Sequence, residues 1–369
     1  MSSSRTWPFR YEILDGLRGL AALTVVLHHL LIVTVGAYAV MIFFVISGYC
    51  ITAAAESCRR KQMSFGTFMR RRLHRIYPPY FLAIVFFFLT RLVKAATTGD
   101  HHELNRPWLD WLQNLTLTQW LSLPFHPVAD APQNPKLLVA AFWSLNYEEQ
   151  FYLVMGIALL LSVRRGLPIA VAVIVLAAAG LFWNYANPGG WITGFFIEYW
   201  AHFSLGALLF LVMCVYPHAA ARRAFVLAVA GLGVFCVWHI VPWHADTPLR
   251  QRAFVELAVA CGFTLFLFFM RPASEYVTRL TLWRPIAALG VISYSLYLVH
   301  QFNLTLVHTI ATRLAPGAWE PVRDLILVGL EITIAAVFWY FCERPFLNRT
   351  PQREAQGTAA ANLPATRNA

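Results

Sequence analysis

The chain has 369 residues, of which 59% are hydrophobic and only 13% are charged, and its mean hydropathy is +0.57. A soluble domain carries about 25% charged residues, so this composition excludes an ordinary soluble protein and predicts a membrane protein. The net charge of +11 does not indicate nucleic-acid binding, because the basic residues lie between apolar segments and form no separate basic domain.

Ten apolar segments of bilayer-spanning length follow one another along the chain. A helix needs about 20 apolar residues to cross the hydrocarbon core. The expected spans are residues 17–36, 38–56, 76–96, 141–162, 167–185, 195–216, 224–242, 253–270, 286–312 and 323–343. The first two are almost contiguous, which predicts a tight helical hairpin. The sequence therefore predicts an all-α, polytopic membrane protein with about ten transmembrane helices.

Lysine and arginine residues are concentrated at one set of span ends, for example at residues 59–61 and 70–75. Cytoplasmic loops carry an excess of these residues. Both termini are therefore predicted to be cytoplasmic, in a multi-pass protein of the inner membrane. One transmembrane domain is expected over residues 1–349, followed by a disordered cytoplasmic tail at 350–369, because that segment is rich in Ala, Asn and Thr.

The first span contains an arginine and a histidine eleven residues apart. At about 100° and 1.5 Å per residue, Arg18 and His29 share one helix face and lie about 16 Å apart along the axis. His29 is expected a little beyond the bilayer midplane, where an ionisable group is costly and is a candidate functional residue. The alternative is a histidine that only satisfies a hydrogen bond between helices. Asp15, one turn before Arg18, is the expected ionic partner of that arginine.

A basic cluster, FMRRRLHRIYPPY, precedes the third span. Arg72 and Arg75 are spaced i, i+3, so they project from one helix face. Guanidinium groups bind phosphate oxygens through bidentate, charge-assisted hydrogen bonds. Together with Arg71, they are expected to hold the phosphates of a nucleotide-like ligand that enters from the cytoplasm. The alternative is that the cluster serves only as a topology signal.

Two adjacent carboxylates, Glu148 and Glu149, lie in the fourth span, roughly 10–12 Å below the outer surface. Neighbouring residues cannot share one helix face, so one is expected to face the bundle and the other its rim or a partner. His29 and Glu148 are expected at similar depths. A carboxylate there would orient the imidazole and raise its basicity, as the third member of a catalytic triad does.

Further polar residues are expected to bind substrate: Tyr297 and His300 of the ninth span, Ser47 of the second, and Glu149. Tyr297 and His300 are i, i+3 neighbours and can line one cavity. Ser47 is not expected to be a nucleophile, because no GxSxG motif surrounds it. The six cysteines form no CxxC motif, and no HExxH motif occurs, so neither a disulfide framework nor a metal site is predicted.

Six motifs together resemble acyltransferase family 3, a family of integral-membrane O-acyltransferases. They are DGLRG with Arg-x10-His, FFVISGY, RRLHRIYPPY, WSLNYEEQFYL, SYSLYLVH and ERPF, and they follow the family order from residue 15 to 346. The resemblance implies ten transmembrane helices, cytoplasmic acyl-CoA (most often acetyl-CoA) as donor, and a hydroxyl of an outer-face glycan or lipid-linked saccharide as acceptor. It maps the essential arginine and histidine of the family onto Arg18 and His29. Its Arg-x-x-Arg maps onto Arg72 and Arg75, and its acidic residue onto Glu148.

The sequence departs from the family pattern at two places. Met41 stands where an acidic residue is often found shortly before FFV, and Asn146-Tyr147 replaces a smaller pair of the Ser-Val type. The resemblance leaves open whether the acceptor is an O-antigen, an exopolysaccharide, a peptidoglycan precursor or a small glycoside.

The expected activity is O-acyl transfer, with His29 as general base or transient acyl carrier. Arg18 would orient the donor or support the basic mouth, and Glu148 would tune or orient the imidazole. The expected partners are acyl-CoA, a glycan or lipid-linked saccharide, and membrane lipids, with no metal and no nucleic acid.

The main rival is a proton-coupled transporter or flippase, in which His29, Glu148 and His300 relay protons. That rival predicts inverted repeats, which the sequence lacks, and a third reading, a non-catalytic scaffold, leaves the buried polar groups unexplained.

Overall fold

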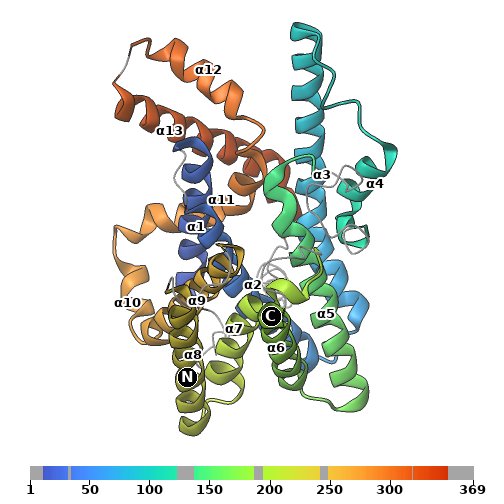
Figure 1. The fold of residues 1–369 in the computed structure, drawn as a ribbon, viewed down its shortest axis with the longest axis vertical. Helices are drawn as coiled ribbons and strands as arrows, with labels where there is room; N and C mark the ends of the chain where they lie inside the picture. The colour runs from blue at the N-terminus through green and yellow to red at the C-terminus, as the bar shows by residue number, and fades with distance from the viewer. Residues whose placement is uncertain are drawn as a thin grey trace, which may run out of the picture.

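The computed structural model describes residues 11–31, 35–122, 137–186, 194–241, 248–317 and 319–347, and those residues form helices and no strands (Figure 1). The expected tail at 350–369 lies outside these ranges. The α-helices are α1 (Ile13–Leu31), α2 (Gly36–Arg60), α3 (Phe65–Thr98), α4 (Trp108–Thr116), α5 (Trp143–Arg165), α6 (Ile169–Ala186), α7 (Ile197–Phe210), α8 (Ala219–Ile240), α9 (Pro248–Met270), α10 (Ser274–Arg279), α11 (Trp283–Val299), α12 (Leu304–Leu314) and α13 (Glu320–Phe338). A 3-10 turn (Ala140–Phe142) precedes α5, and π-turns follow α7 (Leu211–Val215) and α13 (Trp339–Glu343).

Eight helical segments in the described part of the chain are long and apolar enough to cross a bilayer. They are α1, α2, α3, α6, α7 with its π-turn, α8, α9 and α13 with its C-terminal turns. The 23-residue α5 is about 34 Å long, but it carries the polar residues at 146–150 and is not one of these eight segments. With α5 and the pair α11–α12 each taken as one span, the ten expected segments all correspond to helices. The prediction of an all-α, polytopic membrane protein is confirmed.

The predicted continuous helix over 286–312 is wrong, because α11 and α12 meet at an angle of 108°. The break falls at His300. Nδ1 of His300 lies 2.9 Å from the carbonyl oxygen of Tyr297, and it occupies the acceptor that the N–H of residue 301 would use if the α-helix continued. The expected cavity-lining pair therefore sits at a helix end and not along a straight span.

The first helical hairpin is present, but α1 begins and ends four to five residues earlier than the expected span. It ends at Leu31, and α2 begins at Gly36. His29 consequently lies in the last turn of α1, about 24 Å along the axis from Ile13. This places the imidazole near the hairpin end of the helix, whereas the sequence predicted a position close to the middle of the span.

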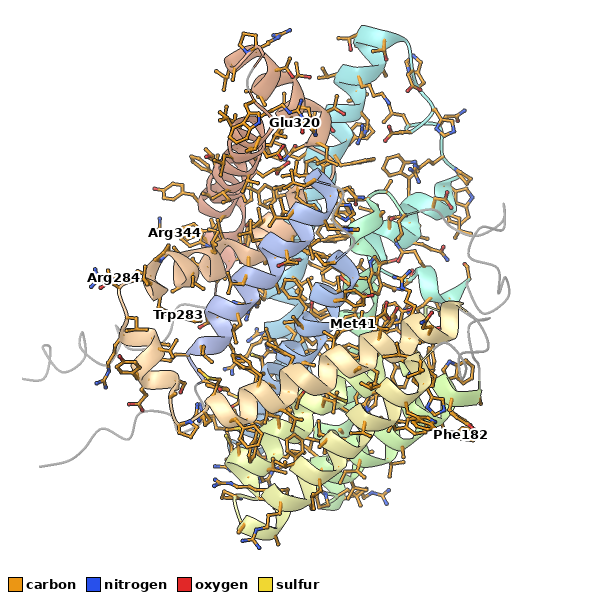
Figure 2. The ribbon with its side chains drawn as sticks, turned by 60° about the vertical axis from the view of Figure 1, so that its left-hand side comes forward. Met41, Phe182, Trp283, Arg284, Glu320 and Arg344 are labelled. Atoms are coloured by element: carbon orange, nitrogen blue, oxygen red, sulfur yellow. The ribbon has the colours of Figure 1, made fainter. Side chains whose placement is uncertain are left out.

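Several helix ends and the turns beside them carry Lys and Arg residues, at 59–61, 70–75, 164–165, 222–223, 284 and 344. These ends are called the basic side. Figure 2 shows that Arg284, at the start of α11, and Arg344, just after α13, lie on the same side of the molecule, with Glu320 at the other end of α13. Met41, where the family pattern often has an acidic residue, is completely buried inside the bundle (Figure 2). Its side chain is packed against protein and does not line the pocket described below.

Helices α1 and α11 pack closely because a glycine of one faces a glycine of the other. A Cβ atom on Gly19 would collide with the backbone of Gly290, and a Cβ atom on Gly290 would collide with the carbonyl group of Asp15. Small residues allow membrane helices to approach at backbone distance. Gly48 and Gly206 create the same close approach between α2 and α7. These contacts bring the polar residues of α1, α2 and α11 around one space.

Replacing Gly290 by alanine is expected to destabilise the protein by about 1–3 kcal/mol, because the added methyl group has no room against the backbone of α1. The measurement is thermal unfolding of the purified protein in detergent. Gly262→Ala in α9 is the matched control, since a Cβ atom there meets open space. Equal stability of the two variants would contradict the importance of this helix contact.

Candidate active site

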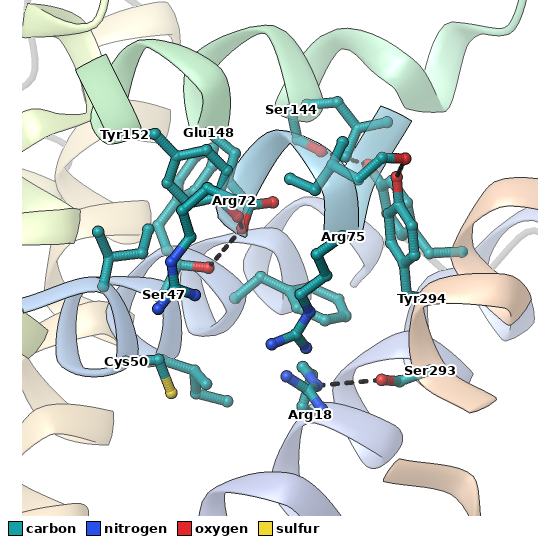
Figure 3. A pocket seen from close by; sticks show the side chains of 17 residues that line it. Arg18, Ser47, Cys50, Arg72, Arg75, Ser144, Glu148, Tyr152, Ser293 and Tyr294 are labelled. Atoms are coloured by element: carbon teal, nitrogen blue, oxygen red, sulfur yellow. Dashed lines mark hydrogen bonds between the residues drawn. The ribbon is translucent and has the colours of Figure 1, made fainter. Parts of the chain in front are cut away.

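One pocket gathers charged and polar side chains from five helices (Figure 3). Its polar lining consists of Arg18 from α1, Ser47 and Cys50 from α2, Arg72 and Arg75 from α3, Ser144, Glu148 and Tyr152 from α5, and Ser293, Tyr294 and Tyr297 from α11. Many of the residues expected to form the site from sequence therefore meet in the same place.

Three guanidinium groups extend into this pocket, those of Arg18, Arg72 and Arg75 (Figure 3). Nε of Arg18 donates to Oγ of Ser293 at 3.1 Å, and its Nη2 lies 3.4 Å from Oδ1 of Asp15, the expected partner. Guanidinium groups form charge-assisted hydrogen bonds with anionic oxygens. The cluster therefore provides donors for an anionic ligand.

Arg71, the third arginine expected at the mouth of the pocket, lies outside it. Its side chain is exposed, and its Nη1 is 3.6 Å from Sδ of Met63. The difference from Arg72 and Arg75 follows from helix geometry, because a residue one step along α3 points about 100° away.

Glu148 lies among the arginines and not beside the imidazole of His29. Its Oε1 accepts hydrogen bonds from the Tyr152 hydroxyl at 2.7 Å and from the Ser47 hydroxyl at 3.4 Å. It lines the same pocket as Arg72 and Arg75. No contact between Glu148 and His29 occurs in the described structure, so the two side chains expected to pair are in different parts of the site.

Glu149 lies on a different face of α5, as expected for its adjacent position. Its Oε1 accepts a hydrogen bond from the Tyr77 hydroxyl at 2.8 Å, and that hydroxyl also lies 3.1 Å from the carbonyl oxygen of Thr116. Glu149 therefore joins α5 to α3 and to the end of α4, outside the pocket.

Sequence reasoning assigned no role to Glu343, a second carboxylate near the arginines. It is only 4% exposed, and its Oε2 accepts hydrogen bonds from the backbone N–H and the hydroxyl of Ser295 at 3.1 and 2.5 Å. The charges of Arg18 and Arg75 act on it. The signal in the sequence was the ERPF motif, which places a carboxylate at the close of the last span.

Tyr297 forms the wall of the pocket that faces the histidines. Its hydroxyl is hydrogen bonded to Oγ of Ser144 at 2.6 Å and donates to the carbonyl oxygen of Ala141 at 2.5 Å. Its ring centroid lies 5.7 Å from that of Phe43, which also lines the pocket. These contacts tie α11 to the start of α5 and close the pocket on this side.

A cluster of three histidines lies beyond Tyr297. The ring of His29 is 5.1 Å from that of His300 and 4.8 Å from that of His28, measured between centroids. The ring of His300 is in turn 5.9 Å from that of Tyr297. His300 is completely buried and His29 is half-buried. The site thus consists of an arginine-lined pocket and a histidine cluster, and Tyr297, which lines the pocket, contacts the cluster through His300.

Within the described ranges, no group of three or more His, Cys, Asp and Glu side chains is arranged to hold a metal ion. The chemistry that these residues can supply is anion binding by arginine, and proton or acyl transfer by imidazole.

Residues 11–342 match the model of a family described as an acyltransferase domain. The chain is similar to the peptidoglycan O-acetyltransferase OatA of Listeria monocytogenes, with 26% identity over 90% of this chain and 55% of OatA. It is 27% identical to the exopolysaccharide production protein ExoZ of Rhizobium meliloti, over 87% of this chain and 92% of ExoZ. It is also 31% identical to a Komagataeibacter xylinus protein provisionally named membrane-bound transacylase BcsY, over 79% of this chain and 72% of BcsY. The chain spans about half the length of OatA, and no solved structure matches it.

Proposed function

The chain belongs to acyltransferase family 3, and from this premise we propose that it is a membrane-embedded O-acyltransferase. It transfers an acyl group, in the simplest case acetyl, from acyl-CoA to a hydroxyl group of a glycan of the cell envelope. The glycan acceptor is supported by the names of OatA and ExoZ, which refer to peptidoglycan and to exopolysaccharide.

The observation that carries this proposal is the convergence of Arg18, Arg72 and Arg75 in one pocket. CoA carries a diphosphate and a 3′-phosphate, and guanidinium groups bind phosphate oxygens through charge-assisted hydrogen bonds. In the proposed complex the arginines hold these phosphates, and Glu148 keeps the arginine side chains in place. The pantetheine arm then runs along the pocket toward Tyr297.

His29 acts as the general base in the proposed reaction. It takes the proton of the acceptor hydroxyl, and the hydroxyl oxygen attacks the carbonyl carbon of the thioester. The new C–O bond forms as the C–S bond breaks, and the imidazolium returns the proton to the departing CoA thiolate. The thioester reaches His29 by passing between the rings of Tyr297 and Phe43, which must move apart.

The alternative is a covalent route in which His29 itself carries the acyl group. The two routes differ in one result: in the covalent route, a labelled acyl group stays on the protein when the acceptor is omitted.

The protein is a multi-pass membrane protein, and the positive-inside rule supports a cytoplasmic location for its basic side. In the proposed orientation both termini are cytoplasmic in the inner membrane, and the arginine pocket receives cytoplasmic acyl-CoA. His29, near the opposite end of α1, then lies toward the face at which an envelope glycan is presented. In this proposal the acyltransferase domain comprises residues 1–349.

Cys50 allows donor binding to be tested without a transfer assay, because its thiol lines the pocket beside the arginines. In a variant that keeps only this cysteine, acetyl-CoA at ten times its Kd is expected to slow alkylation of Cys50 by about tenfold, by simple occupancy. Mass spectrometry of the alkylated protein measures the rate. A matched variant that keeps only Cys342, which is partly exposed and outside the pocket, should react at the same rate with or without acetyl-CoA. Unprotected Cys50 at saturating acetyl-CoA would argue against a donor site here.

A further inference from the structure

His300 makes one hydrogen bond that determines which of its ring nitrogens carries the proton. Its Nδ1 lies 2.9 Å from the carbonyl oxygen of Tyr297. A carbonyl oxygen can only accept a hydrogen bond, so Nδ1 must be the donor and must carry the hydrogen. The ring is completely buried, and an uncharged imidazole is the form that burial favours. In that form Nε2 bears a lone pair and is an acceptor.

This acceptor is unsatisfied in the described structure. Nε2 of His300 is buried and has no hydrogen-bond partner, whereas buried polar atoms in native proteins are nearly always paired. The ring of His29 is 5.1 Å away, with an angle of 36° between the two planes. At this separation a single water, or a small rotation of one ring, joins the two imidazoles. Catalytic hydrogen bonds are often open in this way before substrate binds.

We infer that His300 is the positioning residue for His29. Its Nε2 accepts the N–H of His29, directly or through one water, and thereby holds the His29 ring with its other nitrogen available to the acceptor hydroxyl. This is the part played by the carboxylate in a serine-protease triad, here filled by an uncharged group. The inference rests on the proposed role of His29 as base.

A neutral partner fits this location better than the carboxylate that the sequence suggested. Glu148 accepts hydrogen bonds from the hydroxyls of Ser47 and Tyr152 and lines the arginine pocket. An additional carboxylate beside His29 would be a buried charge, which is costly unless it is fully paired. An imidazole fixed by the carbonyl group of Tyr297 orients its neighbour without that cost.

Two substitutions separate this role from a structural one, because each keeps a different half of the imidazole. His300→Asn retains an amide nitrogen near the position of Nδ1, which can still donate to the Tyr297 carbonyl, but has nothing at the position of Nε2. His300→Gln places an amide oxygen near the position of Nε2. A purely structural role at the helix break depends on Nδ1 and predicts that asparagine is the better replacement. The positioning role predicts that glutamine is.

The experiment follows the rate at which surface glycans gain base-labile acetate, in a deletion strain complemented with each full-length variant at matched abundance. His300→Asn is expected to lower this rate by about 10- to 100-fold, as loss of an orienting partner of an imidazole does elsewhere, and His300→Gln should keep most of it. Protection of Cys50 by acetyl-CoA should be unchanged in both, which shows that the donor pocket is intact. Equal rates for the two variants, or a lower rate for glutamine, would overturn the inference.

Combining His300→Asn with His29→Ala tests whether His300 acts through His29. If His300 acts only by positioning His29, it has nothing to position once His29 is alanine. Adding His300→Asn to His29→Ala should then cause no further loss of the residual rate. Independent, multiplying losses would overturn the inference. A His29→Ala variant with full activity would instead refute the proposed role of His29 as the base, so the failure of that role and the failure of the inference about His300 are distinguishable.

Discussion

Replacing His29 by alanine is expected to lower the rate of acyl transfer by about 10²- to 10⁴-fold, the usual contribution of a general base. Donor binding should be preserved, because His29 lies beyond Tyr297 and does not line the arginine pocket. The rate is measured as base-labile acetate on the surface glycans of a complemented deletion strain, and donor binding as protection of Cys50 by acetyl-CoA.

His308→Ala is the matched control for His29→Ala, because His308 is an exposed histidine on α12. It should leave both the transfer rate and Cys50 protection unchanged. If His29→Ala retained normal transfer at normal protein abundance, His29 would be neither the base nor an acyl carrier.

Replacing both Arg72 and Arg75 by alanine is expected to weaken acetyl-CoA binding by about 10- to 100-fold for each guanidinium removed, the range for hydrogen bonds to a charged group. Both side chains extend into the pocket (Figure 3), so their loss removes direct phosphate contacts. The wild-type affinity should also fall as salt is added, and the double variant should respond less steeply, because screening then acts on fewer charges.

Arg70→Ala provides the control for the arginine variants. Arg70 belongs to the same basic cluster and carries the same charge, but its side chain is exposed and it does not line the pocket. A titration of acetyl-CoA against Cys50 labelling compares the affinities. An unchanged midpoint in the double variant, or an equal shift with Arg70→Ala, would show that the pocket does not bind the CoA phosphates.

Much of the fold could be predicted because a bilayer imposes simple requirements on a sequence. Apolar length identifies the spans, and all ten expected segments correspond to helices. The break between α11 and α12 could not be predicted, because neither proline nor glycine marks it. It depends on His300 bonding to the Tyr297 carbonyl, which is an interaction of a side chain with its own helix end.

The sequence anticipated which candidate site residues lie together where they share one helix, and less well where they belong to different helices. The i, i+3 spacing predicted that Arg72 and Arg75 share one face and that Arg18 pairs with Asp15, and the structure has both arrangements. Depth counted from opposite surfaces suggested that Glu148 meets His29, but depth contains no information on the rotation of α5 or on which helix lies beside α1. That neighbour is α11, and the contact depends on glycines that face each other across the helix interface.

The central claim is that one chain binds acyl-CoA at its basic side and passes the acyl group to a hydroxyl on the opposite side. The most direct measurement uses the purified protein in sealed vesicles, with [acetyl-14C]acetyl-CoA outside and unacetylated surface glycan from the deletion strain inside. We predict that the label becomes ester-linked to the enclosed glycan while free CoA appears outside. Movement of intact glycan across the membrane without release of CoA, or no label on the glycan, would contradict the account.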